Sequence, residues 1–182
     1  NIRTELRGVI MTVAAIMMGV GAGGVNPVDF NGTSAYMARG SSFTGVSNSK
    51  TGLFSGWFRL DGGDAAEMMV YHTQGTRTIS RNASNQFQFT FNDIAGTPNL
   101  SFTSSNTYVS SASWINVQAA WDLSAGTAQM YINGVSDIAI TTLTNSNIRH
   151  DLPASVGARA THDSYFNGCM AEVYFAQGQY LD

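Results

Sequence analysis

Carboxylates and histidines are the side chains of this sequence that could carry acid–base chemistry, and their spacing argues against it. The 182-residue chain holds three glutamates, Glu5, Glu67 and Glu172. A retaining glycosidase needs two carboxyl groups about 5 Å apart, and alternate residues of one strand can supply them because they share a face. Glu172 stands in CMAEVYF with no acidic residue two or four positions away. We therefore expect the chain not to be an enzyme, and a glycoside hydrolase is the least favoured function.

The other candidates for catalysis or transition-metal binding are scattered. The histidines, His72, His150 and His162, lack metal-ligand spacing such as His-x-x-x-His. His150 and His162 each precede an aspartate in neighbouring late loops, so a site that joins them stays open beside the simpler interpretation as exposed loop residues. No Gly-x-Ser-x-Gly motif nominates a nucleophile. The single cysteine, Cys169, excludes a Cys-only zinc site and is expected to be a small buried side chain.

Aromatic side chains offer a different kind of site, because they can stack on sugar rings while Asn or Asp side chains bond the hydroxyl groups. Tyr108 and Tyr165 lie in polar stretches and are expected to be exposed. With the neighbouring Asp163 they are the candidate ligand-binding residues. The other aromatic residues considered for this role stand among apolar neighbours on expected strands, where core packing is the favoured role: Trp57, Tyr71, Trp114, Trp121 and Tyr131.

The elements that must position these residues are short strands. Within residues 114–135, apolar and polar side chains alternate on both sides of a Ser-Ala-Gly break, which predicts a hairpin. Residues 53–60 carry apolar groups on both faces and predict a central strand covered on each side. Near the end of the chain, Ala171, Val173 and Phe175 alternate with other residues and predict one apolar row. Further short strands are expected at 28–30, 68–72, 77–81, 86–91, 100–103, 138–140 and 155–159.

Turn residues separate these strands at roughly ten-residue spacing, and no amphipathic helix follows residue 26. The Asn31-Gly32 turn is predicted to pair the strand at 28–30 with a segment around Tyr36. The pattern favours an all-β antiparallel sandwich or barrel in one domain, residues 26–182. Composition agrees, because only 12% of the residues are charged and 43% are hydrophobic, with Gly, Ser, Thr and Asn prominent among the rest.

Charge and the N-terminal run limit the partners. The formal charge is −3 without a long basic run, so nucleic acid is not an expected partner. Residues 8–25 form an uncharged, apolar run that a signal peptide, a membrane span or an ordered arm could explain. The run is short and glycine-rich for a span. We favour residues 1–25 as an arm that attaches the domain to other subunits of a larger assembly, with a homo-oligomer expected and no membrane span.

Three stretches carry a family resemblance: VDFNGTSAYM at 28–37, GLFSGWFRL at 52–60, and WDLSAGTAQMYINGV at 121–135 followed by SVGARATHDSYFNGCMAEVYF at 155–175. Together they resemble the concanavalin A-like lectin/glucanase superfamily and its LamG-like branch. The resemblance covers about residues 26–176. It implies a jelly roll of two packed antiparallel sheets, one of them concave, with ligands bound at the concave face or at the rim loops.

The resemblance also implies that calcium could bind in rim loops through Asp and Asn oxygen atoms, which suit this hard cation. Asp61, Asp64 and Asp93 are the metal candidates, and Asn92 and Asp163 are further loop positions that could contribute. Turn chemistry explains Asp-Gly and Asn-Asp equally well, so both interpretations stay open.

The low charge and the small polar residues also resemble LamG-like domains of bacteriophage virion proteins. We therefore expect a non-enzymatic structural and adhesion module on a virion or another extracellular surface, as a capsid decoration, tail or fibre component. The alternative is a carbohydrate-binding lectin domain of a secreted protein, with glycans as its partner.

Overall fold

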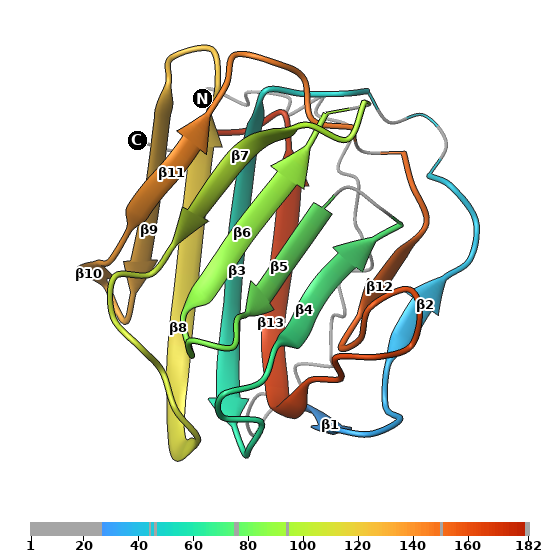
Figure 1. Cartoon of the computed structure of the whole chain (residues 1–182), viewed down its shortest axis with the longest axis vertical. Coiled ribbons are helices and arrows are strands. Elements are labelled where there is room, and N and C mark those ends of the chain that lie inside the picture. The colour runs from blue at the N-terminus through green and yellow to red at the C-terminus, as the bar shows by residue number, and fades with distance from the viewer. Residues whose placement is uncertain are drawn as a thin grey trace, which may run out of the picture.

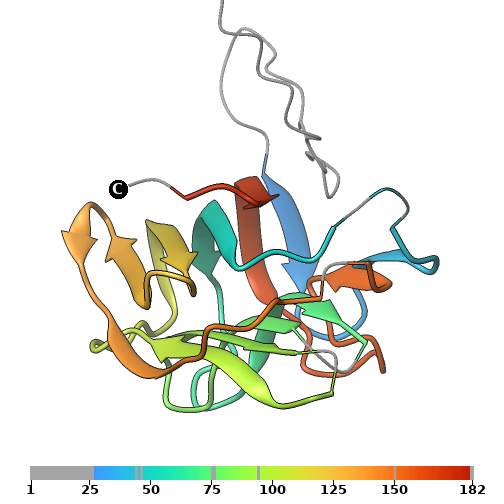
Figure 2. The same ribbon diagram turned by 90° about the horizontal axis from the view of Figure 1, so that it is seen from above.

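The computed structural model describes residues 27–43, 45, 47–74, 77–93, 95–149 and 151–180. They form two antiparallel β-sheets packed face to face (Figures 1 and 2), which confirms the predicted all-β sandwich. The predicted arm at residues 1–25 lies outside the described residues, as does His150. The part of the chain that the structure describes contains no helix suited to crossing a lipid bilayer.

The six-stranded sheet contains the first and last strands of the described residues. Its order is β1 (Val28–Asn31), β13 (Asn167–Gln177), β3 (Thr51–Leu60), β8 (Ser111–Asp122), β9 (Thr127–Ile132) and β10 (Val135–Ser136). The seven-stranded sheet has the order β11 (Ala139–Leu143), β7 (Pro98–Thr103), β6 (Phe87–Asn92), β5 (Arg77–Arg81), β4 (Met68–Thr73), β12 (Ala154–Val156) and β2 (Met37–Arg39).

The predicted hairpin is confirmed as β8 and β9, which pair from Val117 opposite Ile132 to Asp122 opposite Thr127. Its turn is fixed by the Asp122 side chain, which accepts hydrogen bonds from the backbone N–H groups of Ser124 and Ala125. The chain then turns again into β10 through Asn133-Gly134. Both residues have positive φ, 52° and 77°, as a tight type I′ hairpin requires.

Aromatic side chains from both sheets fill the space between them. The ring of Phe89 in the seven-stranded sheet lies 5.4 Å from that of Phe54 in the six-stranded sheet, edge to face. Trp121 is fully buried and packs against Phe91 with the ring centroids 5.1 Å apart. Gly52 makes room for it, because a Cβ atom there would lie 2.2 Å from Trp121 Cζ2. The core therefore depends on a glycine at position 52 as well as on bulky aromatic side chains.

The predicted pairing across Asn31-Gly32 is wrong. Strand β1 pairs with β13, whereas β2, the strand near Tyr36, pairs with β12 in the other sheet. The Asn31 side chain accepts hydrogen bonds from three consecutive backbone N–H groups, those of residues 33, 34 and 35. The resulting loop carries the chain from one sheet to the other instead of folding it back on itself.

The predicted alternation of Ala171, Val173 and Phe175 is also broken. A β-bulge falls between Ala171 and Tyr174, and within it Glu172 has a φ of 49°. Ala171 is paired with Trp57, while Tyr174 is paired with Ser55 and Phe175 with Phe54. Because a bulge adds one residue to its strand, the side chains after it change faces. Phe175 thereby reaches the core and Tyr174 points away from it.

Candidate ligand-binding face

The outer face of the six-stranded sheet, meaning the side turned away from the core, carries the most exposed aromatic side chains of the sheet. On β3, Phe54 and Phe58 are buried between the sheets, so the alternate residues Ser55 and Trp57 face outward. Trp57 is 39% exposed, and Tyr131 on β9 is 38% exposed. The prediction that these two side chains belong to the core is therefore wrong, whereas Trp121 is buried as predicted.

One row of side chains crosses this face from β13 to β9. Tyr174 lies opposite Ser55, Ser55 opposite Gln118, and Gln118 opposite Tyr131. Directly paired residues share a face, and neighbouring strands are about 4.8 Å apart, so the two tyrosines stand roughly 14 Å apart across three strand spacings. We call these four residues the tyrosine row. It has an aromatic ring at each end and a hydroxyl and an amide between them.

Two shallow depressions flank the tyrosine row. Trp57, Trp114, Ala171 and Glu172 line a depression of about 300 Å³, in which the small Ala171 beside Trp57 leaves the indole uncovered. The second depression, of about 370 Å³, includes the outward side chains of Ser55, Gln118, Gln129 and Tyr131. The Gln129 amide donates a hydrogen bond to the Tyr180 hydroxyl at 3.1 Å. Neutral hydrogen-bonding groups therefore accompany the aromatic rings along the row.

Tyr108, predicted to be an exposed ligand-binding residue, is instead partly buried. Its ring packs on Phe87 with the centroids 5.5 Å apart, and its hydroxyl donates to Asp137 Oδ2 at 2.5 Å. The Asp137 carboxylate, only 4% exposed, also accepts the backbone N–H groups of Ser105 and Asn106. Burial and this carboxylate raise the pKa of Tyr108. These contacts fix the loop between β7 and β8, and sequence reasoning did not single out Asp137.

The structure places Tyr165 and Asp163 together in the loop before β13, and no hydrogen bond or ring contact among the described residues joins them to Tyr108. Tyr165 lies 6.3 Å from the ring of Tyr36, which itself stacks on His162 at 4.4 Å. Asp163 accepts from Thr161 and lies 3.5 Å from Arg159. The hydrogen bond from Thr161 lowers the pKa of the Asp163 carboxyl. Their proposed role in ligand binding stays a prediction.

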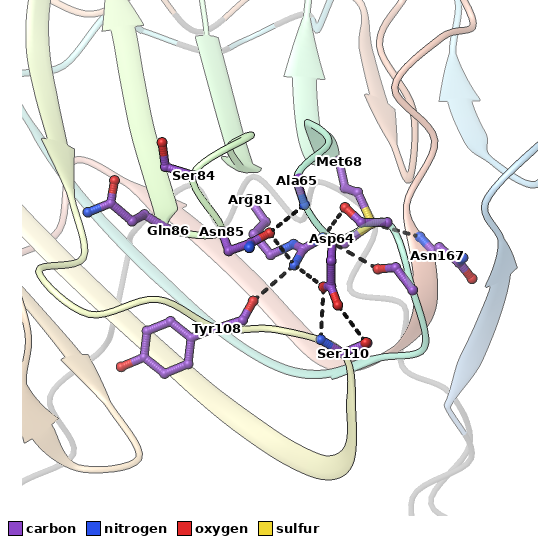
Figure 3. A network of polar contacts seen from close by, with 12 residues as sticks. Asp64, Ala65, Met68, Arg81, Ser84, Asn85, Gln86, Tyr108, Ser110 and Asn167 are labelled. Atoms are coloured by element: carbon purple, nitrogen blue, oxygen red, sulfur yellow. Dashed lines mark hydrogen bonds and ion pairs between the residues drawn. The ribbon is translucent and has the colours of Figure 1, made fainter.

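Asp64 lies in a polar network that ties three loops together (Figure 3). The buried Arg81 donates to Asp64 Oδ1 at 2.7 Å, to Asn85 Oδ1 at 2.9 Å and to the Tyr108 carbonyl at 3.0 Å. Ser110 donates to the same carboxylate through both its hydroxyl and its backbone N–H. Hydrogen bonds from Ser110 and then Arg81 lower the pKa of Asp64. Its oxygen atoms are thus held in structural contacts.

The other two metal candidates occupy separate places. Asp93 caps a turn by accepting the backbone N–H groups of residues 95 and 97. Asp61 is bound by the guanidinium of Arg59 at 2.8 Å, and this hydrogen bond lowers the pKa of Asp61. Within the described ranges, the potential ligand atoms of Asp61, Asp29 and Cys169 lie within 4.8 Å of one another, but Asp64 and Asp93 do not join them.

The chemistry of this trio does not match calcium. Burial raises the pKa of the Cys169 thiol, which is buried as the sequence predicted, and calcium prefers oxygen donors. Arg59 already engages the Asp61 carboxylate. Sequence reasoning missed Asp29 as a neighbour of Asp61 because the two residues meet only through the pairing of β1, β13 and β3. Calcium binding by this chain stays a prediction.

Comparison with known families decides where the chain belongs. The family model described as the concanavalin A-like lectin/glucanases superfamily matches residues 30–178. The chain belongs to this superfamily. Comparison with curated proteins finds no match. The predicted resemblance to the superfamily is therefore confirmed over most of the described residues.

Three solved structures have a fold similar to that of this chain. Domains LG4-5 of the mouse laminin α1 chain share 15% identity with this chain, with a TM-score of 0.59, and the match covers 87% of this chain and 43% of that one. A Bacteroides ovatus protein, named as a candidate carbohydrate-binding protein, has 13% identity, a TM-score of 0.65 and coverages of 83% and 43%. A mutant of NanB sialidase from Streptococcus pneumoniae has 15% identity, a TM-score of 0.64 and coverages of 87% and 26%.

These identities support the fold alone, and the chain spans less than half of the length of each of these three proteins. The three structures are named as laminin domains, a candidate carbohydrate-binding protein and a sialidase. Any function of this chain must therefore be argued from its own residues.

Proposed function

We propose that the chain is a non-enzymatic adhesion module that holds a glycan against the outer face of its six-stranded sheet. The observation that supports this proposal most strongly is the tyrosine row together with Trp57. Tyr131, Tyr174 and Trp57 are each about two-fifths exposed, although nothing in the strand pattern requires an aromatic side chain at an outward position. Ring faces can stack on sugar rings, and the neutral Ser55 and Gln118 between them can bond hydroxyl groups.

The charge of the row favours a neutral glycan. All four members of the tyrosine row are uncharged. The depression beside Trp57 and Trp114 contains one carboxylate, that of Glu172. An acidic polysaccharide would need cationic partners to replace the water around its charges. Arg59 lies close to Trp114, and it is bound to Asp61.

The carboxylates support a binding role over hydrolysis. Glu172 has no second carboxylate among the residues that line its depression. Asp29 and Asp61 lie close together, but the hydrogen bond from Arg59 lowers the pKa of Asp61. Glycoside hydrolysis needs a carboxylic acid whose pKa is raised so that it can protonate the leaving group. The lowered pKa of Asp61 is the opposite of this requirement.

We further propose that the module acts outside the cell, on the surface of a virion, and that residues 1–25 attach it to other subunits in a homo-oligomer. The apolar composition of residues 8–25 and the resemblance to LamG-like virion domains support this placement. Sedimentation of the full chain and of a chain lacking residues 1–25 tests the attachment. Loss of the oligomer on deletion is expected, and an unchanged mass would reject it.

A glycan array probed with the full chain tests the binding function directly. Neutral oligosaccharides are expected to give signals, and acidic ones are not. Repeating the array with calcium and with a chelator separates a metal-dependent site from the metal-independent tyrosine row. Uniformly blank arrays under both conditions would refute the proposal.

A further inference from the structure

A cavity separate from the depressions of the outer face lies between the two sheets. It has a volume of about 180 Å³ and is lined almost entirely by apolar side chains, among them Met37, Phe43, Phe54, Val173 and Phe175. These residues come from both sheets and from the loop after β2. The cavity lies where β1 no longer borders β13, because the pairing of these two strands ends with Val28 opposite Met170. The remainder of β13 continues past this point to Gln177.

One residue of the cavity lining, Tyr71, has a buried hydroxyl that lacks a partner among the described residues. Tyr71 is 3% exposed, and its hydroxyl forms no hydrogen bond within the part of the chain that the structure describes. Its ring packs edge to face on Phe175, with the centroids 5.4 Å apart. A buried hydroxyl without a partner destabilises a fold. Burial raises the pKa of Tyr71.

The positively charged side chain of Arg39 lies at the mouth of the same cavity. The guanidinium carbon of Arg39 lies 4.5 Å above the ring of Phe43, and Arg39 Nε donates to the Ser41 carbonyl. Among the described residues no carboxylate lies within ion-pairing distance of Arg39. The positive charge of Arg39 favours an anion.

We propose that this cavity binds a small carboxylate that carries one aromatic or branched aliphatic group. The apolar group fills the space among Phe43, Phe54 and Phe175, and the carboxylate pairs with Arg39 at the mouth. An apolar cavity of about 150 Å³ accommodates a benzene-sized group, so the volume here fits a phenyl ring with a short linker. This ligand differs in chemistry and in location from a glycan on the outer face.

The test is an NMR titration of the isotope-labelled full chain with 3-phenylpropionate, beside its neutral analogue 3-phenylpropanamide. We expect saturable chemical-shift changes at Met37 and Val173. The carboxylate should bind roughly tenfold more tightly than the amide, because it forms one charge-assisted contact that the amide lacks. Arg39→Gln should remove this preference while leaving the affinity for the amide within about twofold. Arg149→Gln is the matched control, since that half-buried arginine is already paired with Asp151.

Tyr71→Phe provides a second, independent variant. It should leave the affinity for both probes within about twofold, and it should not lower the stability of the free protein, because it removes a buried hydroxyl that has no partner among the described residues. The proposal is overturned if no saturable shift occurs up to about 10 mM probe, or if both probes bind equally. Nuclear Overhauser contacts from the cavity lining to side chains of residues 8–25, unchanged by the probe, would also overturn it by identifying a different occupant.

Discussion

Replacing Trp57 with alanine gives the sharpest test of the outer face, because the structure sets an upper limit on its effect. An exposed tryptophan presents roughly 250 Å², so a side chain that is 39% exposed leaves about 100 Å² for a ligand to cover. At about 25 cal/mol per Å² this area contributes at most about 2.5 kcal/mol. A sugar ring covers one face of the indole, so about half of this value is expected. The variant should bind roughly tenfold more weakly.

Isothermal titration calorimetry with a neutral oligosaccharide selected on the array measures the loss. Tyr36→Ala is the matched control, because Tyr36 is 38% exposed but stacks on His162 away from the tyrosine row. Urea unfolding of each variant shows that binding is compared between folded proteins. Wild-type affinity in Trp57→Ala together with weakened binding in Tyr36→Ala would refute the assignment of the face and move the site to the loop before β13.

Three further predictions concern the framework. Gly52→Ala should lower the free energy of unfolding by about 1–3 kcal/mol through overpacking against Trp121, whereas Gly40→Ala, with open space around it, should be nearly neutral in the same urea titration. Tyr108→Phe should cost about 1–3 kcal/mol because Asp137 loses a donor while the ring packing on Phe87 is kept, and equal stability of Tyr108→Phe and wild type in urea would contradict this. Asp64 has a lowered pKa in the folded state, so its stabilising effect is present above the unfolded value of about 3.9 and is lost as the pH falls below it. Unfolding midpoints measured from pH 6 down to about pH 2 should therefore fall less steeply in Asp64→Asn than in wild type.

The sequence predicted those features that depend on neighbouring residues. The β8–β9 hairpin followed from alternation on both sides of a turn, and the turn is closed by Asp122, which precedes it directly. The two-sheet fold followed from many such short segments. The burial of Cys169 and Trp121 agreed with their apolar neighbours.

The candidate site could not be predicted in the same way. Alternation shows that Trp57 and Phe58 face opposite sides, but it does not tell which side another layer covers. The tyrosine row brings together residues of four strands, and its register depends on pairings between distant segments. A polar neighbourhood suggested that Tyr108 is exposed, whereas its partner, Asp137, lies 29 positions further along the chain.

The extra residue in β13 also affects how this chain should be compared with its relatives. Relative to β3, the register of β13 after Tyr174 is shifted by one residue from its register before Ala171. An alignment that treats this strand as uninterrupted would therefore exchange inward and outward positions over half of its length. Grafting this binding surface onto another jelly roll would require transferring the insertion at Glu172 along with the aromatic side chains, since point substitutions alone would place Tyr174 inside the host protein.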